Sequence, residues 1–168
     1  IFTIDSIPNF EEITPKNIEK HIPILLKELN QELIVFETDL QSKLDTNSGL
    51  FWDEIIGRLH KIEKQLHSSW GVVSHLYGVA NSPELREVYS LQQPDVIRFC
   101  NRLGQSQILF SALNRLLVDN KDHLDATQKR IIQNFTFVRT QEGIAEVEIP
   151  EIVWNLDSNL AVLSVPSV

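Results

Sequence analysis

Methionine is absent from the 168 residues, and cysteine occurs only once, at Cys100. Because translation starts at methionine, we expect this chain either to lack its original ends or to be a fragment of a longer one. A single cysteine cannot form a disulfide within the chain, which excludes a disulfide-built secreted scaffold. Cys100 shares an apolar helix face with Val96 and Phe99, so we expect its thiol to be buried and unreactive.

Basic residues are scarce relative to acidic ones, 15 against 23, and the net charge is −8. A negative field of this size disfavours phosphate backbones and anionic bilayers, so we expect no nucleic-acid partner and no membrane partner. No apolar run approaches the roughly 18–20 residues that span a bilayer. The first five residues also lack the basic and apolar segments of a secretion signal. We therefore expect a cytoplasmic protein.

The short motifs of catalysis are missing as well. The zinc-protease pattern H-E-x-x-H, its inverse H-x-x-E-H, the nucleophile elbow G-x-S-x-G and the phosphate-binding glycine loops do not occur. The acidic pairs Glu11-Glu12 and Asp53-Glu54 stand at expected helix starts, where the helix dipole accounts for them. The sequence therefore predicts no catalytic, cofactor-binding or metal-binding residue in this chain.

Histidines form the one pattern that points toward a metal. His60, Glu63 and His67 are spaced i, i+3 and i+7, so they share one helix face, and imidazole and carboxylate groups are zinc ligands. Two histidines nearly two turns apart could share a metal only with help from another helix. We therefore prefer a solvated helix face, with an enzyme built on these three residues as the weaker alternative. His21 and His75 are interpreted as packing or capping residues.

Apolar residues recur at steps of three and four along most of the chain, which is the period of amphipathic helices. Thr14-Pro15 predicts the start of the first helix, and Pro23 predicts a break or kink within it. A second long helix is expected over about residues 55–80, and Ser82-Pro83-Glu84 starts a third.

Two further signals divide the rest of the helical region. Pro94 is expected to open or kink another helix, which continues through Gly104, and Asp125 is expected to cap the last one. The predicted fold class is mainly α, an antiparallel bundle of four or five helices with short connections.

The pattern changes after Asn134. Short β-prone pieces follow, separated by glycine, proline and polar residues, and the stretch 160–165 is apolar and uncharged, so it must be buried or paired. We predict a helical domain at 1–134 and a divergent, irregular or β-prone tail at 135–168 that is not a separate domain.

Several segments, in the same order, resemble the N-terminal region of the oligopeptidase A and thimet oligopeptidase family of zinc metallopeptidases. They are FEEITPKNI at 10–18, Trp52-Asp53, SWGVVSHL at 69–76, NSPELREVY at 81–89, LGQS at 103–106 and LDATQKR at 124–130. The resemblance covers about residues 7–134.

This resemblance implies a role without catalysis. Members of the family are much longer and cleave short peptides in a channel between two largely helical halves, and their H-E-x-x-H helix and zinc belong to the C-terminal half. No counterpart of those motifs occurs here, so no family catalytic residue can be assigned and zinc is expected only in full-length members. The helices would form part of a channel wall that excludes folded proteins.

Alternative interpretations remain open. The chain could be a truncated or frameshifted remnant with an unselected tail, or a module that evolved its own ending. It could also be a stand-alone helical module that binds a peptide or protein in a groove near Phe51, Trp52, Trp70 and Tyr77, although ordinary core packing is the preferred explanation of these aromatic residues. An incomplete domain would expose apolar surface normally covered by the missing half, which predicts self-association, with short peptides as further candidate partners.

Overall fold

The computed structural model describes residues 8–137, 154–155 and 160–161. Helices account for most of this part, which confirms the predicted mainly α fold with four or five helices. The elements in chain order are a 3-10 turn at Phe10–Glu12, α1 at Pro15–Asp45, a π-helical segment at Asp53–Gly57, α2 at Arg58–Val79, α3 at Pro83–Gly104, α4 at Gln107–Asp119, α5 at Ala126–Phe137, β1 at Trp154–Asn155 and β2 at Leu160–Ala161.

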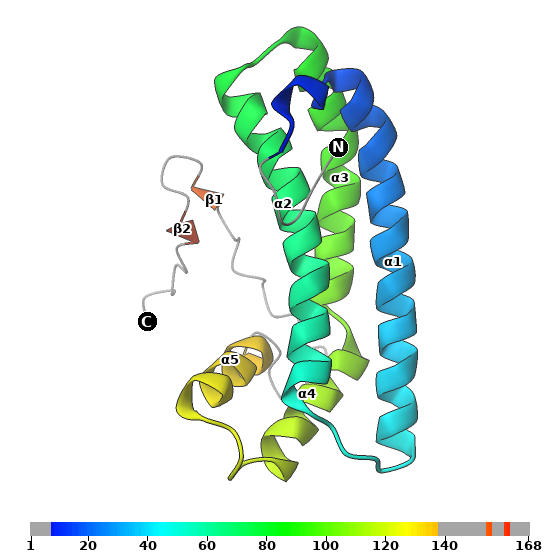
Figure 1. Ribbon diagram of the computed structural model, residues 1–168, viewed down its shortest axis with the longest axis vertical. Coiled ribbons are helices and arrows are strands. Elements are labelled where there is room, and N and C mark those ends of the chain that lie inside the picture. Colours follow the sequence, from blue (N-terminus) through cyan, green and yellow to red (C-terminus); the bar gives the residue numbers. More distant parts are fainter. Residues whose placement is uncertain (1–7, 138–153, 156–159, 162–168) are drawn as a thin grey trace, which may run out of the picture.

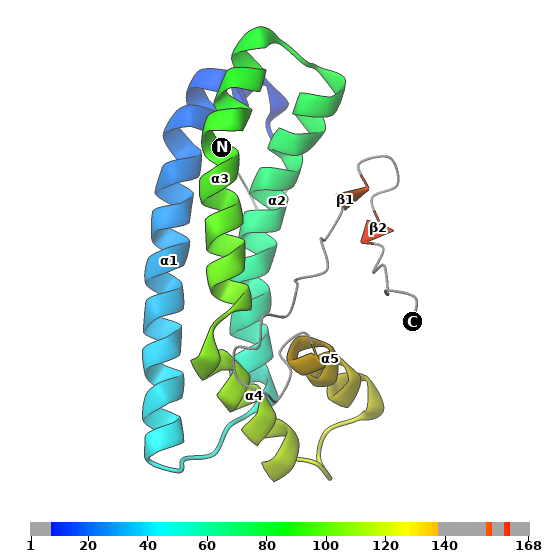
Figure 2. The same cartoon turned by 180° about the vertical axis from the view of Figure 1, so that it is seen from behind.

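Helices α1, α2 and α3 lie side by side and alternate in direction, so they form an antiparallel three-helix bundle (Figure 1). Helix α4 continues beyond the end of α3, where it still contacts α1, and α5 packs on α4. The view from behind shows the same order, with α4 and α5 at the lower end of the bundle (Figure 2). Short connections at 46–52 and 80–82 permit only antiparallel neighbours.

The core follows the apolar stripe of α1. This helix buries Ile18, Ile22, Leu25, Leu26, Leu29, Leu33, Phe36 and Leu40 against the neighbouring helices. Each such side chain contributes about 1.5–3 kcal/mol relative to an exposed one. Because α1 supplies one residue at nearly every turn, its packing holds the bundle together along its whole length.

A break or a kink was predicted at Pro23; the break is wrong, because α1 runs from Pro15 to Asp45 without interruption, and the kink stays a prediction. The start of α1 is as expected: Thr14 Oγ1 accepts from the backbone N–H of Asn17 at 3.3 Å. Proline inside a helix costs about 3 kcal/mol through a lost hydrogen bond and a ring clash. The buried stripe on both sides of Pro23 outweighs this local cost.

The boundary between the third and fourth helices also differs from the prediction. Pro94 lies inside α3, which is continuous from Pro83 to Gly104, and the chain leaves the helix only at residues 105–106. Ser106 Oγ then accepts from the backbone N–H of Leu109 at 3.3 Å and caps α4. Gly104 and Ser106, rather than Pro94, are the residues that divide this region.

Helix α5 begins with the capping box predicted at Asp125. Asp125 Oδ1 accepts from the backbone N–H of Gln128 at 2.8 Å, and Gln128 Oε1 accepts from the backbone N–H of Asp125 at 3.0 Å. The helix ends at Phe137, so it extends beyond Asn134, where β-prone structure was expected to start.

Two short strands follow in the C-terminal region. β1 and β2 pair antiparallel, with Trp154 opposite Ala161 and Asn155 opposite Leu160. These residues agree with the predicted β-prone tail, whereas the rest of 138–168 lies outside the described residues. The division into a domain at 1–134 and a tail at 135–168 stays a prediction.

An arginine on α2 ties it to α1. Arg58 Nε donates to Glu32 Oε1 at 2.8 Å, and its Nη1 donates to Asp39 Oδ2 at 2.6 Å. The guanidinium also lies over the Phe36 ring, 5.0 Å from its centroid. The two carboxylates raise the pKa of Arg58 against the opposing effect of burial. This group therefore fixes the register of two helices.

None of the described helices combines the length and the apolar character needed to cross a bilayer.

Candidate functional site

The histidine face of α2 is the pattern that pointed toward a metal in the sequence. His60 and His67 are exposed, whereas Glu63 between them is half-buried. Burial raises the pKa of Glu63, and the neighbouring charges of His60 and His67 oppose that rise. Within the part of the chain that the structure describes, no three His, Cys, Asp or Glu side chains lie close enough to hold a metal ion. The alternative of an enzyme built on these three residues therefore gains no support from the described part of the chain.

Cys100 corrects another expectation, because it is exposed rather than buried. Phe99 and Leu103 occupy the buried face of α3, and Cys100 lies at its edge near Glu63 of α2. Partial burial and the charge of Glu63 raise the pKa of the thiol. A raised pKa keeps the thiol protonated at neutral pH, so Cys100 is exposed but poorly nucleophilic.

Three aromatic residues stack where α2 meets α3. The Trp70 and Tyr89 rings lie 4.8 Å apart between centroids, and the Tyr77 and Tyr89 rings lie 4.3 Å apart. Tyr89 therefore covers one face of Trp70 and one face of Tyr77, two of the four residues predicted to lie near a peptide groove. Trp52 precedes Trp70 by 18 positions, a distance of roughly 27 Å along a helix. The structure therefore brings Trp70 and Tyr77 together through Tyr89 but leaves Trp52 apart from them.

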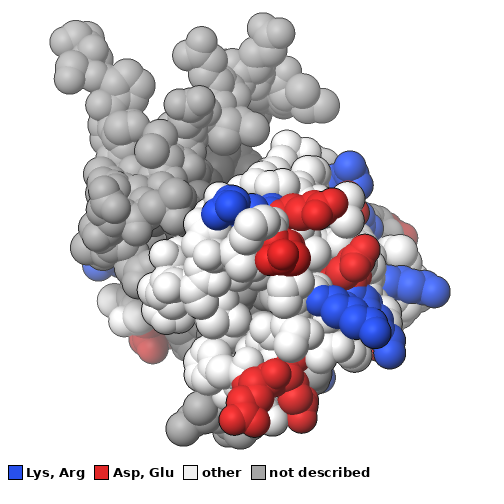
Figure 3. Space-filling model, turned by 90° about the horizontal axis from the view of Figure 1, so that it is seen from above, with Lys and Arg blue, Asp and Glu red and all other residues white. Residues whose placement is uncertain are grey.

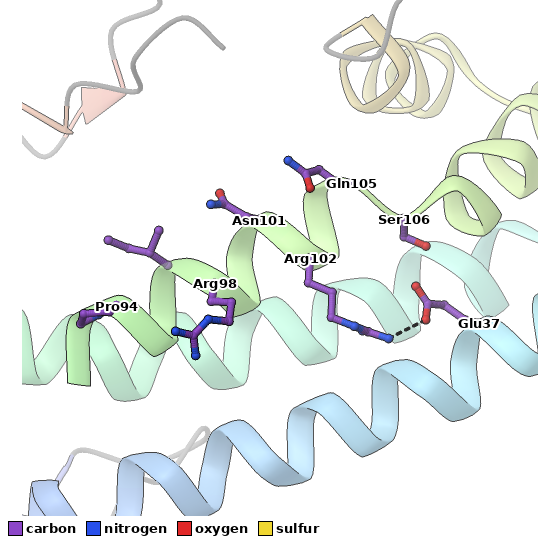
Figure 4. A pocket seen from close by; sticks show the side chains of 8 residues that line it. Glu37, Pro94, Arg98, Asn101, Arg102, Gln105 and Ser106 are labelled. Carbon is purple, nitrogen blue, oxygen red and sulfur yellow. Dashed lines mark hydrogen bonds and ion pairs between the residues drawn. The ribbon is translucent and has the colours of Figure 1, made fainter. Parts of the chain in front are cut away.

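A cleft with a volume of about 640 Å³ lies between α1 and α3 at the start of α4. Its lining combines two cations, one anion, amides and apolar side chains: Glu37, Pro94, Ile97, Arg98, Asn101, Arg102, Gln105 and Ser106. Arg98 and Arg102 extend toward α1, whereas Asn101 and Gln105 stand on the opposite edge of α3 (Figure 4). This cleft is a groove open to solvent rather than an enclosed cavity.

Arg102 is the unusual group in this cleft. Its Nη2 donates to Glu37 Oε2 at 2.9 Å. Its Nη1 is buried and has no hydrogen-bond partner among the described residues. Glu37 is largely covered, with 17% of its side chain exposed, whereas Arg98 is 75% exposed and pairs with Asp95. The ion pair between Arg102 and Glu37 thus leaves one guanidinium nitrogen without an acceptor.

This cleft was not predicted from the sequence. Glu37 and Arg102 are 65 residues apart, so only the tertiary fold brings them together. The sole sequence signal is the spacing of Arg98, Asn101, Arg102 and Gln105 at i, i+3, i+4 and i+7, which assigns them to adjacent parts of one helix surface.

A second cleft, of about 590 Å³, lies between the lower ends of α1 and α2. Its cations already have partners, because Lys43 pairs with Glu54 and Arg58 pairs with Asp39. Figure 3 views the molecule from above, at the end of the bundle opposite this cleft, and there Lys and Arg side chains lie beside Asp and Glu side chains on the right-hand part. Positive and negative side chains are therefore interspersed at that end, so its electrostatic field does not have a single sign.

Comparison with known proteins identifies the domain. The family model for the N-terminal domain of neurolysin and thimet oligopeptidase matches residues 22–146. The chain belongs to this family. The match starts inside α1 and includes α2 to α5, so it covers both clefts and the aromatic stack. It confirms the resemblance seen in the sequence and extends it beyond Asn134.

Members of the oligopeptidase A group are among its relatives. The chain is 29% identical over 109 residues to a probable cytosolic oligopeptidase A of Arabidopsis thaliana, covering 65% of this chain and 14% of that protein. It is 27% identical over 137 residues to oligopeptidase A of Escherichia coli strain K12, covering 80% of this chain and 19% of that protein. An organellar oligopeptidase A of Arabidopsis thaliana, chloroplastic or mitochondrial, is 29% identical over 109 residues, which are 65% of this chain and 13% of that protein.

The chain spans less than a fifth of the length of these relatives. It corresponds to the N-terminal domain of oligopeptidase A-like peptidases. No solved structure matches it.

Proposed function

We propose that this chain acts as a non-catalytic N-terminal scaffold of an oligopeptidase A-like zinc metalloendopeptidase that degrades short peptides. The observation that carries the proposal is the match of residues 22–146 to the N-terminal domain of this family. Hydrogen bonds between helices also support it, because Arg58 ties α2 to α1 and Arg115 ties α4 to the segment that follows α1. Zinc would belong to the catalytic part of the full-length enzyme.

A peptidase assay tests the absence of catalysis. The full chain is incubated with quenched fluorescent peptides and added zinc, with oligopeptidase A of Escherichia coli as the positive control. We expect no zinc-dependent turnover by this chain. Peptide cleavage that disappears on chelation and returns with zinc would overturn the proposal.

A chimera tests the scaffold role itself. Residues 22–146 would replace the corresponding segment of the Escherichia coli relative, which this chain matches over 137 residues. If these helices form a channel wall, the chimera should cleave short peptides and leave a folded protein substrate intact. A folded, zinc-loaded chimera that cleaves neither, or both equally, contradicts a scaffold role.

The partner assignment is also a proposal. Ile24, Ile34 and Val35 of α1 and Leu91 and Ile97 of α3 are large apolar side chains exposed to solvent. In the isolated chain such surface favours self-association. Sedimentation should therefore show concentration-dependent oligomers that Ile34→Glu weakens, whereas a monomer at every concentration would contradict this expectation.

A cytoplasmic location is proposed from the kinship with a relative described as probably cytosolic. Another relative is organellar. Cell fractionation with a tagged full-length protein distinguishes the two compartments.

A further inference from the structure

The cleft between α1 and α3 contains a buried hydrogen-bond donor that has no acceptor among the described residues. Buried donors in folded proteins are nearly always paired, and an unpaired charged donor is costly. Arg102 Nη1 is such a donor, while Nη2 of the same guanidinium makes a single hydrogen bond to Glu37. The pair is therefore monodentate, although a guanidinium and a carboxylate can form two parallel hydrogen bonds. A ligand carboxylate that replaced Glu37 could accept from both Nη1 and Nη2 and so complete the bidentate pair.

The other lining residues indicate what else the ligand carries. Arg98 lies one turn before Arg102 and extends toward the same helix, so it adds a second cation (Figure 4). Asn101 and Gln105 present amides that can pair with a peptide main chain, since an amide both donates and accepts. Ile97 is half exposed beside them and offers an apolar contact. Carboxylate, peptide group and apolar side chain occur together at the C-terminal end of a short peptide.

We propose that this cleft binds the free C-terminal carboxylate of a short peptide through Arg102, which turns from Glu37 toward the ligand. The peptide then lies across α3, with its last side chain at Ile97 and its main chain at Asn101 and Gln105. Glu37 acts as an internal competitor that holds Arg102 in the empty cleft. This inference does not depend on the proposed scaffold role, because it concerns binding to the chain alone.

Peptide titration of the full 168-residue chain, followed by NMR chemical shifts, tests the site. The probe is N-acetyl-Ala-Ala-Leu with a free C-terminus, and its matched control is the same peptide as the C-terminal amide. We expect saturable binding of the acid and none of the amide. Equal binding of the two, or no saturable binding of either, overturns the proposal.

Substitutions at the two ends of the ion pair should have opposite effects. Arg102→Gln should weaken binding of the acid by about tenfold or more, as expected for a lost charge-assisted hydrogen bond. Glu37→Gln should tighten it by about threefold or more, because the competitor is gone. If Glu37→Gln weakens binding as Arg102→Gln does, the ion pair only maintains the structure and the proposal fails. Arg86→Gln, at the other end of α3, is the matched control and should leave affinity unchanged.

Two additions keep the test decisive. If Arg102→Gln unfolds the chain, Asn101→Asp replaces it: Asn101 is exposed, and the added negative charge should weaken binding of the acid. N-acetyl-Ala-Glu-Ala amide carries only a side-chain carboxylate, so it distinguishes recognition of a side-chain carboxylate from recognition of a C-terminal one. Binding of that peptide, or of inorganic phosphate, as tight as that of the free acid overturns the assignment to a peptide C-terminus.

Discussion

Arg115 of α4 donates through Nη2 to the carbonyl oxygen of Ser48 at 2.8 Å, across 67 residues of sequence. Its Nη1 lies within 3.4 Å of the carbonyl oxygens of Lys43 and Leu44, and its Nε donates to Asp119. The last carbonyl groups of a helix have no partner within that helix. One arginine therefore closes the C-terminal end of α1 and anchors α4 to it.

Replacement of Arg115 by lysine should be destabilising even though the charge is kept. An ammonium group cannot reach several carbonyl oxygens in the fixed geometry of a guanidinium. We expect the free energy of unfolding to fall by about 1–3 kcal/mol. Urea denaturation measures it, with Arg98→Lys as the control, because Arg98 is largely exposed and should change stability by less than about 0.5 kcal/mol. Equal effects of the two substitutions would show that Arg115 does not clamp α1.

Phe36 offers a test of the core at the contact between α1 and α2. It is 1% exposed and lies under the guanidinium of Arg58. Phe36→Ala should lower the free energy of unfolding by about 3–5 kcal/mol through the cavity and the lost contacts. Phe51→Ala removes the same side chain from a position that is 58% exposed, and it should cost far less. A similar loss at both positions would contradict the assigned core.

The helices were predictable because their signals are local. Thr14, Ser82 and Asp125 each act within three residues, on the backbone N–H groups of the turn they start, and the apolar steps of three and four need no knowledge of the partner helix. The cleft was not predictable, because Glu37 and Arg102 meet only after α1 and α3 have packed. Cys100 was wrongly predicted to be buried for a related reason. It follows the buried Phe99 by one position, and that single step moves it from the buried face of α3 to the edge of that face.

The two internal prolines show that tertiary packing can keep a helix continuous where the local sequence predicts a break. Pro23 and Pro94 lie in uninterrupted stretches of α1 and α3, where each removes one backbone hydrogen bond. Replacement of either by alanine should raise the free energy of unfolding by about 1 kcal/mol or more, after allowance for the entropy that proline removes from the unfolded chain. Thermal unfolding of Pro23→Ala and Pro94→Ala measures this.

Pro83→Ala, at the first position of α3, is the control and should not stabilise the chain, because proline is favourable there. A loss of stability at Pro23 or Pro94 would indicate that the chain requires a break there.

Glu63 and Glu84 should give opposite pH dependences. Burial raises the pKa of Glu63 above its ordinary value of 4.5, so the folded state holds this proton more tightly than the unfolded state. The contribution of Glu63 to stability then falls as the pH rises through the raised pKa, and Glu63→Gln should become stabilising relative to the parent above that range.

Glu84 at the start of α3 has a lowered pKa, because its own backbone N–H and Ser82 donate to its carboxylate. The contribution of Glu84 to stability is present above the pKa that it has in the unfolded state, and it is lost as the pH falls below that value. Glu84→Gln should therefore be destabilising at pH 7 and without effect in acid. Urea unfolding of both variants and the parent between about pH 3 and pH 8 compares the two slopes, because the contribution of Glu84 is lost below its ordinary pKa and that of Glu63 above it. Parallel slopes would mean that Glu63 is not desolvated by its place between α2 and α3.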